Sequence, residues 1–343
     1  MNIHKPYIIA ETAYNHEGDF RYLCSMTDKI AELKVQAIKY HLLLNPAKYI
    51  QDKHPAFKIV QDCLFSKKQW RDIIDRAIRE KLDIIALCDD TESVEFVKKE
   101  YSGIKAIELH AVSLNDYFML KESVSFKGTV ILGVGGSTLD EIEYAVNFLR
   151  GNGKEDILLM YGFQNYPTDY SKINLLKMVK LKKIFDLPVG YADHTAFDDQ
   201  YNEVISCMAG MMGISILEKH FTLDEGKKRI DFEAAVGENQ MLKIKGLLST
   251  VLAVYGSGSM KMSKAEMVYG NTGPMKKAIV AARKIKRGEK LSLSNLCFKR
   301  TREISPVKQK EFLSLIGLPV SKLINKDEVI RLDKLQYDLG KAK

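Results

Sequence analysis

Two short apolar segments near the middle of the chain each end in an acid and a histidine. The first runs Pro-Val-Gly-Tyr-Ala into Asp193 and His194, and the second runs Ser-Ile-Leu into Glu218, Lys219 and His220. A buried strand that delivers polar side chains at its end is typical of an active-site rim. A single histidine is more often structural, but two imidazoles on neighbouring strands could bind one divalent metal ion. We therefore interpret His194 and His220 as candidate metal ligands.

The two segments belong to a longer series of short apolar segments that alternate with amphipathic stretches. Helical patterns include residues 66–80, with Ser66 as the expected N-cap, and 137–150, where Thr138 and Glu141 have capping-box spacing. The predicted strands are residues 7–11, 36–40, 83–87, 105–109, 129–133, 157–161, 188–193 and 215–220. Parallel strands need helical crossovers and are buried on both faces, so eight strand-then-helix units predict a closed α/β TIM barrel. A doubly wound open sheet is the alternative.

The sequence predicts a boundary after this barrel. A helix at about 239–255 is followed by Gly-Ser-Gly-Ser at 256–259, which is typical of a flexible joint. We expect residues 1–255 to form the barrel, 256–275 to be a linker, and 276–343 to form a small β-rich domain. The segments 278–282, 286–291 and 295–299 are predicted there as short strands around a tight turn.

The composition excludes several classes of protein. Five cysteines without a C-x-x-C pair indicate neither a disulfide framework nor a thiolate zinc site, which fits a reducing cytoplasm. No signal-peptide pattern precedes residue 11, and no apolar run is long enough to span a bilayer. The formal charge of +8 is concentrated in residues 276–302, which carry ten Lys or Arg and one acid, Glu289. Such a segment could bind nucleic acid, form a solvated face or cover an anionic substrate.

Polar side chains at the ends of the predicted strands are candidate site residues, because a β/α barrel places its active site there. They are Glu11, Asn15, His16, Lys39, His41, Asp89, Asp90, Glu108, His110, Gln164, Tyr166, Asp193, His194, Glu218, Lys219 and His220. Lys39 would need an anionic partner, from the protein or from a substrate. The glycine-rich turn at 133–138 could bind a phosphate or carboxylate through its amides, or be only a tight strand-to-helix turn.

These residues resemble the sialic acid synthase family, which condenses phosphoenolpyruvate with an N-acyl amino sugar to make nine-carbon 2-keto acids. The matching motifs are Ile-Ile-Ala-Glu at 8–11, Asn-His-Glu-Gly-Asp at 15–19, Ala-Ile-Lys at 37–39, Asn-Tyr-Pro-Thr at 165–168, Asp-His-Thr at 193–195 and Leu-Glu-Lys-His-Phe-Thr at 217–222. Residues 278–300 resemble the family's C-terminal antifreeze-like (SAF) domain. The resemblance covers nearly the whole chain.

The resemblance implies a fold, a cofactor and a set of roles. It implies a TIM barrel followed by a SAF domain, in a domain-swapped homodimer in which the SAF domain of one subunit covers the barrel of the other. His194 and His220 would bind Mn²⁺, with Mg²⁺ or Co²⁺ as alternatives. The carried-over catalytic residues are Glu11, Lys39, Tyr166 and Asp231, with Lys39 binding phosphoenolpyruvate. The substrate-binding candidates are Asn15, His16, Gln164, Asp193 and Arg300, together with Glu108 and His110, which depart from the family pattern. The basic segment then faces an anionic active site, and neither nucleic acid nor a membrane is expected as a partner.

Several positions depart from the family pattern. Glu108 begins a segment, Glu-Leu-His-Ala-Val-Ser, where the family usually has Lys-Ile-Gly-Ser-Gly-Glu, so an acid replaces a phosphate-binding lysine. Gly133 and Ala192 replace serines, Gln164 stands where Asn or Ser is usual, and Arg-Ile-Asp at 229–231 replaces Gly-Pro-Asp. Exchanging lysine for glutamate beside a phosphate turns an attraction into a repulsion, and this change is worth several kcal/mol.

Three interpretations follow from these departures. The family condensation could survive with the phosphate bound by Lys39, the turn at 133–137 and a rearranged basic residue. Glu108 and His110, two residues apart and so on one strand face, could instead serve acid–base chemistry or metal binding for another donor, such as a free 2-keto acid in an aldolase-like reaction. The chain could also be a sugar-binding homologue without turnover. We take a metal-dependent, cytoplasmic transferase of the sialic acid synthase type as the main prediction.

Overall fold

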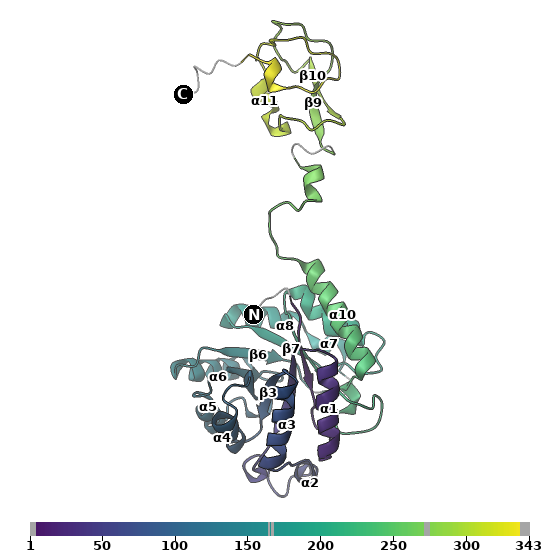
Figure 1. Ribbon diagram of the computed structural model, residues 1–343. Coiled ribbons are helices and arrows are strands. Elements are labelled where there is room, and N and C mark those ends of the chain that lie inside the picture. The colour runs from purple at the N-terminus through teal and green to yellow at the C-terminus, as the bar shows by residue number, and fades with distance from the viewer. Residues whose placement is uncertain (1–4, 164, 166–167, 271–274, 337–343) are drawn as a thin grey trace. The chain divides into compact units, whose positions relative to one another are not determined.

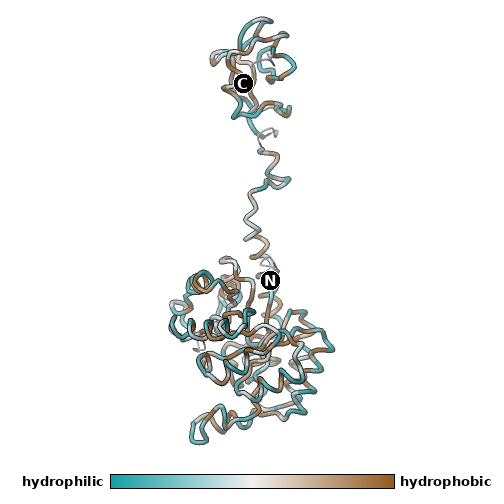
Figure 2. The backbone as a smooth tube through the Cα atoms, turned by 90° about the vertical axis from the view of Figure 1, so that its left-hand side faces the viewer, coloured by the Kyte–Doolittle hydropathy of each residue, from teal (hydrophilic) through white to brown (hydrophobic). Residues whose placement is uncertain are grey.

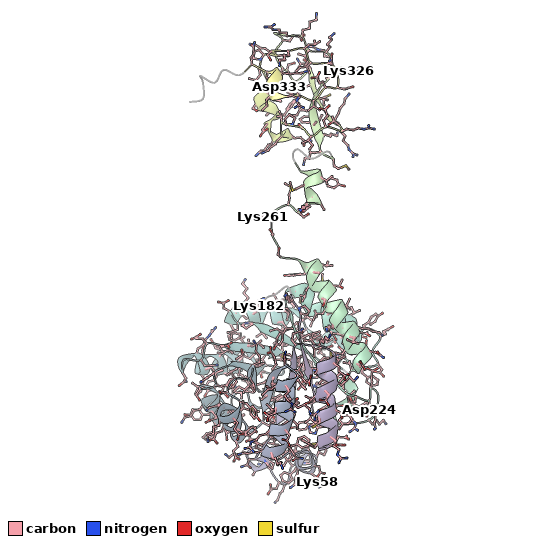
Figure 3. All side chains as sticks on the ribbon, viewed as in Figure 1. Lys58, Lys182, Asp224, Lys261, Lys326 and Asp333 are labelled. Carbon is pink, nitrogen blue, oxygen red and sulfur yellow. The ribbon has the colours of Figure 1, made fainter. Side chains whose placement is uncertain are left out.

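The computed structural model describes residues 5–163, 165, 168–270 and 275–336. The chain forms two compact units, residues 1–257 and 258–343. Figure 1 shows the strands of the first unit enclosed by its helices. Charged side chains such as Lys58, Lys182 and Asp224 are exposed on this first unit (Figure 3). Within the described residues no helix is both long and apolar enough to cross a membrane.

The first unit is a closed barrel of eight parallel strands, in which β8 pairs with β1. The strands are β1 (Tyr7–Glu11), β2 (Ala37–Leu42), β3 (Asp83–Cys88), β4 (Ala106–Leu109), β5 (Thr129–Gly133), β6 (Ile157–Tyr161), β7 (Val189–Asp193) and β8 (Ile216–His220). Each agrees with its predicted range to within two residues at either end. The prediction of a TIM barrel is confirmed, and the open sheet is excluded because the two edge strands are hydrogen bonded to each other.

Helices follow the strands and form the outer layer of the barrel (Figure 1). They are α1 (Phe20–Glu32), α2 (Phe57–Asp62), α3 (Lys67–Arg79), α4 (Thr91–Glu100), α5 (Tyr117–Ser123), α6 (Leu139–Gly151), α7 (Tyr170–Ile173), α8 (Leu176–Phe185), α9 (Asn202–Met208) and α10 (Glu238–Tyr255). Ser66 caps α3, where its hydroxyl accepts from the amide of Gln69 and the Gln69 side chain accepts from the amide of Ser66. Glu141 accepts from the amide of Thr138 at the start of α6. Both predicted helix starts are therefore confirmed.

Two apolar layers hold the barrel together. The larger one lies between strands and helices, and includes Ile38 of β2, Ile73 of α3 and Leu149 of α6. The smaller one fills the barrel interior, with side chains from successive strands: Ile9, Ala37, Ile85, Ala106, Ile131, Leu158, Met160, Ala192 and Ile216. Figure 2 shows the resulting alternation of hydrophobic and hydrophilic residues along the backbone. Because this layer fills the barrel interior, we expect ligands to bind at the carboxyl ends of the strands.

The second unit has its own core. Strands β9 (Lys277–Ala281) and β10 (Leu296–Arg300) pair antiparallel, and a short helix, α11 (Phe312–Leu315), follows. The first and third predicted strands are thus present. The segment 286–291 forms no strand: Lys290 makes an isolated bridge to Pro319, the preceding Ile285 makes one to Ile324, and Gly288 turns the chain between them with a positive φ of 87°. Buried side chains including Ile279, Leu291 and Ile324 form the core of this unit.

The barrel should not tolerate a side chain at Gly162, which follows β6. A Cβ atom there would lie 2.0 Å from the carbonyl oxygen of Ala192, so the backbone of β7 would have to move. We expect Gly162→Ala to lower the free energy of unfolding by about 1–3 kcal/mol, as for other overpacked sites. Gly151→Ala is the control, since a Cβ at that last residue of α6 meets no atom within 4 Å. Urea unfolding that gives equal stabilities for both variants would contradict the proposed close contact.

Candidate active site

The carboxyl ends of the barrel strands surround a cavity of about 280 Å³. Strand alternation explains which side chains reach it, because residues two apart on a strand share one face. Thus β2 contributes Lys39 and His41, and β8 contributes Glu218 and His220. The full lining is Glu11, Lys39, His41, Glu108, His110, Ala111, Val112, Gly133, Gly135, Met160, Gly162, Phe163, Ala192, His194, Glu218 and His220.

The ammonium group of Lys39 lies among three carboxylates at the base of the cavity. Its Nζ is 2.7 Å from Oε1 of Glu218, 3.2 Å from Oε2 of Glu108 and 3.2 Å from Oε1 of Glu11. All four residues are at most 4% exposed. The anionic partner that Lys39 was predicted to need is therefore supplied by the protein itself.

The protonation of this cluster follows from burial and from the mutual charges. Burial alone would lower the pKa of Lys39, but Glu108, Glu11 and Glu218 outweigh it and raise that pKa, so the ammonium persists. Burial would raise the pKa of Glu11, yet Lys39 and His220 hold it well below its usual range. Burial raises the pKa values of Glu108 and Glu218, and Lys39 only partly opposes this. Glu11 is thus the ionised partner, while Glu108 and Glu218 are shifted towards their protonated forms.

Glu11 also links the lysine cluster to the histidines. Its Oε1 lies 2.6 Å from Nε2 of His41, and its Oε2 lies 3.3 Å from Nε2 of His220. The carboxylate of Glu11 raises the pKa of His41 despite burial, which by itself would lower it. One carboxylate therefore holds two imidazoles and one ammonium in place. Sequence reasoning placed His41 at the rim without giving it a role, although its position two residues after Lys39 was the available signal.

His194 and His220 lie together, as the metal prediction requires. Their ring centroids are 5.0 Å apart and the rings are nearly perpendicular, at 84°. Burial, followed by the interaction with His220, lowers the pKa of His194 to about 3, so the His194 imidazole is neutral, as a metal ligand must be. Across the described ranges no three His, Cys, Asp or Glu side chains form a group able to hold a metal ion. His194 and His220 are thus two candidate ligands, and the bound metal ion stays a prediction.

Asp193 does not line the cavity, and its predicted contact with substrate stays a prediction. Ala192 and His194 line the cavity, and the alternation of β7 directs Asp193 outwards towards the helices. There its carboxylate pairs with Nζ of Lys219 at 2.7 Å and accepts from the hydroxyls of Ser206 and Thr195. Asp193 therefore stabilises the junction of β7, β8 and α9.

Lys219 and Glu218 point to opposite faces of β8, as predicted. Glu218 contacts Lys39 inside the barrel, and Lys219 contacts Asp193 outside it. Each of these adjacent residues thus has a buried ion-pair partner on its own side of the strand.

The loop after β1 lies beside the cavity rather than in its lining. Asn15 is completely buried, and neither atom of its amide group has a hydrogen-bond partner within the described residues. The Nδ1 atom of His16 accepts from the amide of Gly18, and burial lowers the pKa of His16 to about 3. Asp231, which has a left-handed φ of 62°, accepts from the amide of Tyr14 at 3.3 Å. The hydrogen bond from the Gly18 amide thus gives His16 a structural role in this loop.

The remaining predicted residues divide into three groups. Glu108 and His110 line the cavity from the end of β4, on one strand face as predicted. Arg300 is exposed on β10 of the second unit, where its guanidinium lies 3.1 Å from Sδ of Met275. Its contact with a barrel stays a prediction. Gln164 and Tyr166 lie outside the described residues.

The fold and this cavity define a β/α-barrel protein with an enzyme-type site at its strand ends. The model of the NeuB family matches residues 27–260, and that of the SAF domain matches residues 276–336. The chain therefore belongs to the NeuB family of sialic-acid-synthase-like enzymes. The predicted resemblance to the sialic acid synthase family and the predicted SAF domain are both confirmed.

Relatives and solved structures match most of the chain. The chain is 29% identical to N,N'-diacetyllegionaminic acid synthase of Campylobacter jejuni, over 95% of this chain and 99% of that protein. It is 27% identical to N-acetylneuraminate-9-phosphate synthase of Drosophila melanogaster, over 94% of each. The fold is similar to that of a putative spore coat polysaccharide biosynthesis protein E from Chromobacterium violaceum, with a TM-score of 0.80 and 20% identity over 97% of this chain and all of that one.

Replacing Lys39 should make stability depend strongly on pH. In Lys39→Met the carboxyl groups of Glu11, Glu108 and Glu218 would be buried without their cation, a loss of about 3–5 kcal/mol near neutral pH. Their folded-state pKa values would then lie above the unfolded value of about 4.3, so stability falls as pH rises above that value. Urea unfolding should show a smaller loss at about pH 5 than at about pH 7.5.

Lys154→Met is the matched control for this measurement. Lys154 is also buried, but its ammonium binds the backbone carbonyl of Phe126 rather than a carboxylate. Its loss should be similar at both pH values. A pH-independent loss in Lys39→Met as well would show that the three carboxyl groups do not depend on Lys39.

Proposed function

We propose that this protein forms a carbon–carbon bond between a three-carbon donor and the aldehyde carbon of an open-chain N-acyl amino sugar, giving a nonulosonic, sialic-acid-like 2-keto acid. The observation that carries the proposal is the cavity that brings Glu11, His194 and His220 together at the barrel mouth. Membership of the NeuB family and the activities named for its relatives support it. The relatives differ in product, so the identity of the sugar is not part of the proposal.

Phosphoenolpyruvate is the donor that the family resemblance implies. Its methylene carbon would attack the aldehyde carbon, water would add to the resulting cation, and inorganic phosphate would leave. His194 and His220 are the residues that would bind the divalent ion, with Mn²⁺ as the first candidate. Such an ion, when bound, polarises the aldehyde oxygen of the sugar.

The chain's own side chains would position the sugar. Glu11 is ionised and lines the cavity, so it can accept hydrogen bonds from sugar hydroxyls. Asp231 is held next to the β1 loop through the Tyr14 amide, which suits a second hydroxyl contact. Tyr166, Gln164 and an Arg300 side chain from the second subunit of a domain-swapped homodimer complete the proposed sugar site. A cytoplasmic location also remains a prediction.

A second candidate donor is an unphosphorylated 2-keto acid. One observation favours it: the ammonium of Lys39, which would otherwise bind the phosphate, already contacts three carboxylates. Both donors would give the same class of product, so the reaction class does not depend on the choice between them.

Substitution of the paired histidines tests the proposed reaction. His194→Ala and His220→Ala should each abolish Mn²⁺ binding and lower kcat/KM by at least about 100-fold, because Lewis-acid assistance contributes several kcal/mol to transition-state stabilisation. Mn²⁺ binding is measured by calorimetry, and turnover by mass spectrometry of the 2-keto acid formed from a panel of N-acyl hexosamines with either donor.

His54→Ala, at an exposed histidine of the β2–α2 connection, is the control. Unchanged turnover in both histidine variants would exclude the metal mechanism, and no product from any sugar would favour a homologue without turnover.

A further inference from the structure

We infer that Arg229 is a positioning residue for the acceptor sugar, because it fixes the part of the β8–α10 connection that carries Asp231. The inference rests on the proposed function, in which Asp231 contacts a sugar hydroxyl. Asp231 is not among the described residues that line the cavity, so neighbouring groups must hold its carboxylate in place. Three features carry the inference: the contacts of Arg229, the backbone conformation of the residues it joins, and the contacts between Asp231 and the cavity.

The guanidinium of Arg229 joins the β8–α10 connection to the β1–α1 connection. Its Nη1 lies 3.2 Å from Oε2 of Glu17 and donates to the backbone carbonyl of Asn15 at 3.3 Å. The same group lies over the ring of Tyr22 in α1, with 3.9 Å between Cζ and the ring centroid. Because Glu17 is 41% exposed, the ion pair alone would contribute little. The three contacts together fix the position of the side chain, which is itself only 14% exposed.

Glu17 also binds the main chain next to Arg229. Its Oε1 accepts from the amide of Ile230 at 3.0 Å, while its Oε2 pairs with Arg229. One carboxylate therefore contacts both a side chain and a backbone amide in the segment directly before Asp231. Two contacts from one carboxylate restrict the orientation of this segment as well as its position.

Two residues in these connections have backbone conformations that need support. Glu17 has a φ of 48° and Asp231 a φ of 62°, both in the left-handed region that residues other than glycine rarely adopt. Such conformations cost free energy and persist only where the surrounding structure holds them. The contacts of Arg229 and Ile230 with Glu17 join the segments that contain these two residues. Their loss should let Asp231 leave the left-handed region and move its carboxylate.

Asp231 is connected to the cavity through Tyr14. Its Oδ2 accepts from the amide of Tyr14 at 3.3 Å. The ring of Tyr14 packs edge-on against His41, with 5.0 Å between the ring centroids. His41 lines the cavity, and its Nε2 lies 2.6 Å from Oε1 of Glu11. Two intervening residues thus separate Asp231 from Glu11, the other carboxylate that the proposed function assigns to the sugar.

The Arg229 contacts should therefore act on sugar binding rather than on the chemical step. Glu17, Asn15 and Tyr22 are not among the described residues that line the cavity, so Arg229 is held away from the reacting atoms. A displaced Asp231 would lose its hydroxyl contact in the ground state and in the transition state alike. A loss that is equal in both states raises KM and leaves kcat unchanged.

Sugar affinity and steady-state kinetics of the full-length, Mn²⁺-loaded protein test the inference. The affinity for each N-acyl hexosamine of the panel is measured by calorimetry, and KM and kcat with the donor that the unaltered protein turns over. We expect Arg229→Ala to raise the Kd and KM of the sugar by about tenfold, as for a lost hydrogen bond to a charged group, with kcat unchanged. Glu17→Ala should have the same effect, even if Arg229→Ala fails to fold.

Two further variants separate positioning from a general loss of structure. Arg229→Lys keeps the charge but lacks the planar group that lies over Tyr22, so it should recover part of the affinity. In an Asp231→Ala background, Arg229→Ala should have no additional effect on KM, because the residue that it positions is already absent. A crystal structure of Arg229→Ala should show Asp231 outside the left-handed region.

Arg71→Ala is the matched control. Arg71 also pairs with a glutamate, Glu100, and lies 5.8 Å from the ring centroid of Phe96, but these contacts join α3 to α4. The substitution removes a comparable arginine away from the strand ends and should leave the affinity, KM and kcat unchanged.

Several outcomes would overturn the inference. Unchanged sugar affinity and KM in both Arg229→Ala and Glu17→Ala would do so while leaving the proposed function intact. Additive effects of Arg229→Ala and Asp231→Ala, or an unmoved Asp231 in the crystal structure, would also contradict it. A sugar that binds more weakly to Arg229→Ala, without product from any sugar in the unaltered protein, would support the inference and contradict the proposed function alone. Binding of no sugar to the unaltered protein would overturn both.

Discussion

The contact between Lys39 and three glutamates is the interaction on which the arrangement of the site depends. The four side chains come from β1, β2, β4 and β8, so the cluster joins four of the eight strands of the barrel. A shift of β2 by one residue would turn Lys39 towards the helices and bring Tyr40 into the interior. Buried ion clusters contribute little net stability, but they penalise such alternatives heavily. The cluster therefore specifies register as well as the electrostatics of the cavity.

Polar groups of β7 and β8 are divided between two environments. Inside the barrel, Glu218 and His220 meet Lys39, Glu11 and His194, while outside it Lys219 meets Asp193. The outer pair holds these two strands against α9 through Ser206. The two histidines are thus carried on strands that are fixed from the outside, which favours a constant distance between their rings.

Much of this organisation could be predicted from the sequence, because the barrel depends on patterns that are local. Short apolar segments with helical stretches between them indicated all eight strands, and the capping residues Ser66 and Glu141 marked helix starts. The polar residues at the predicted strand ends also included many of the residues that line the cavity. The partners of individual side chains could not be predicted in this way. Asp193 was assigned to the site because it lies at a polar strand end, but strand alternation directs its side chain to the face opposite Ala192 and His194.

The charge environment of Lys39 was also beyond local patterns. Its three partners are separated from it along the chain, and their approach depends on the stagger of the closed barrel, which no single segment encodes. The same limit applies to the segment at 286–291, where the turn at Gly288 could be recognised but the bridges to Ile324 and Pro319 could not. Local patterns specify elements, whereas contacts between distant elements require the assembled fold.

The close approach of backbones after β5, β6 and β7 restricts how this site can diversify. A Cβ at Gly135 would lie 1.7 Å from the carbonyl oxygen of Gly162, and one at Gly162 would lie 2.0 Å from that of Ala192. Larger residues cannot replace these glycines without moving the strand ends. In evolution, new substrate preferences must therefore arise mainly on the opposite wall, from the side chains of β8, β1, β2 and β4. That wall carries Glu218, Glu11, Lys39 and Glu108, so most substitutions at these four positions would also change the charge of the cavity.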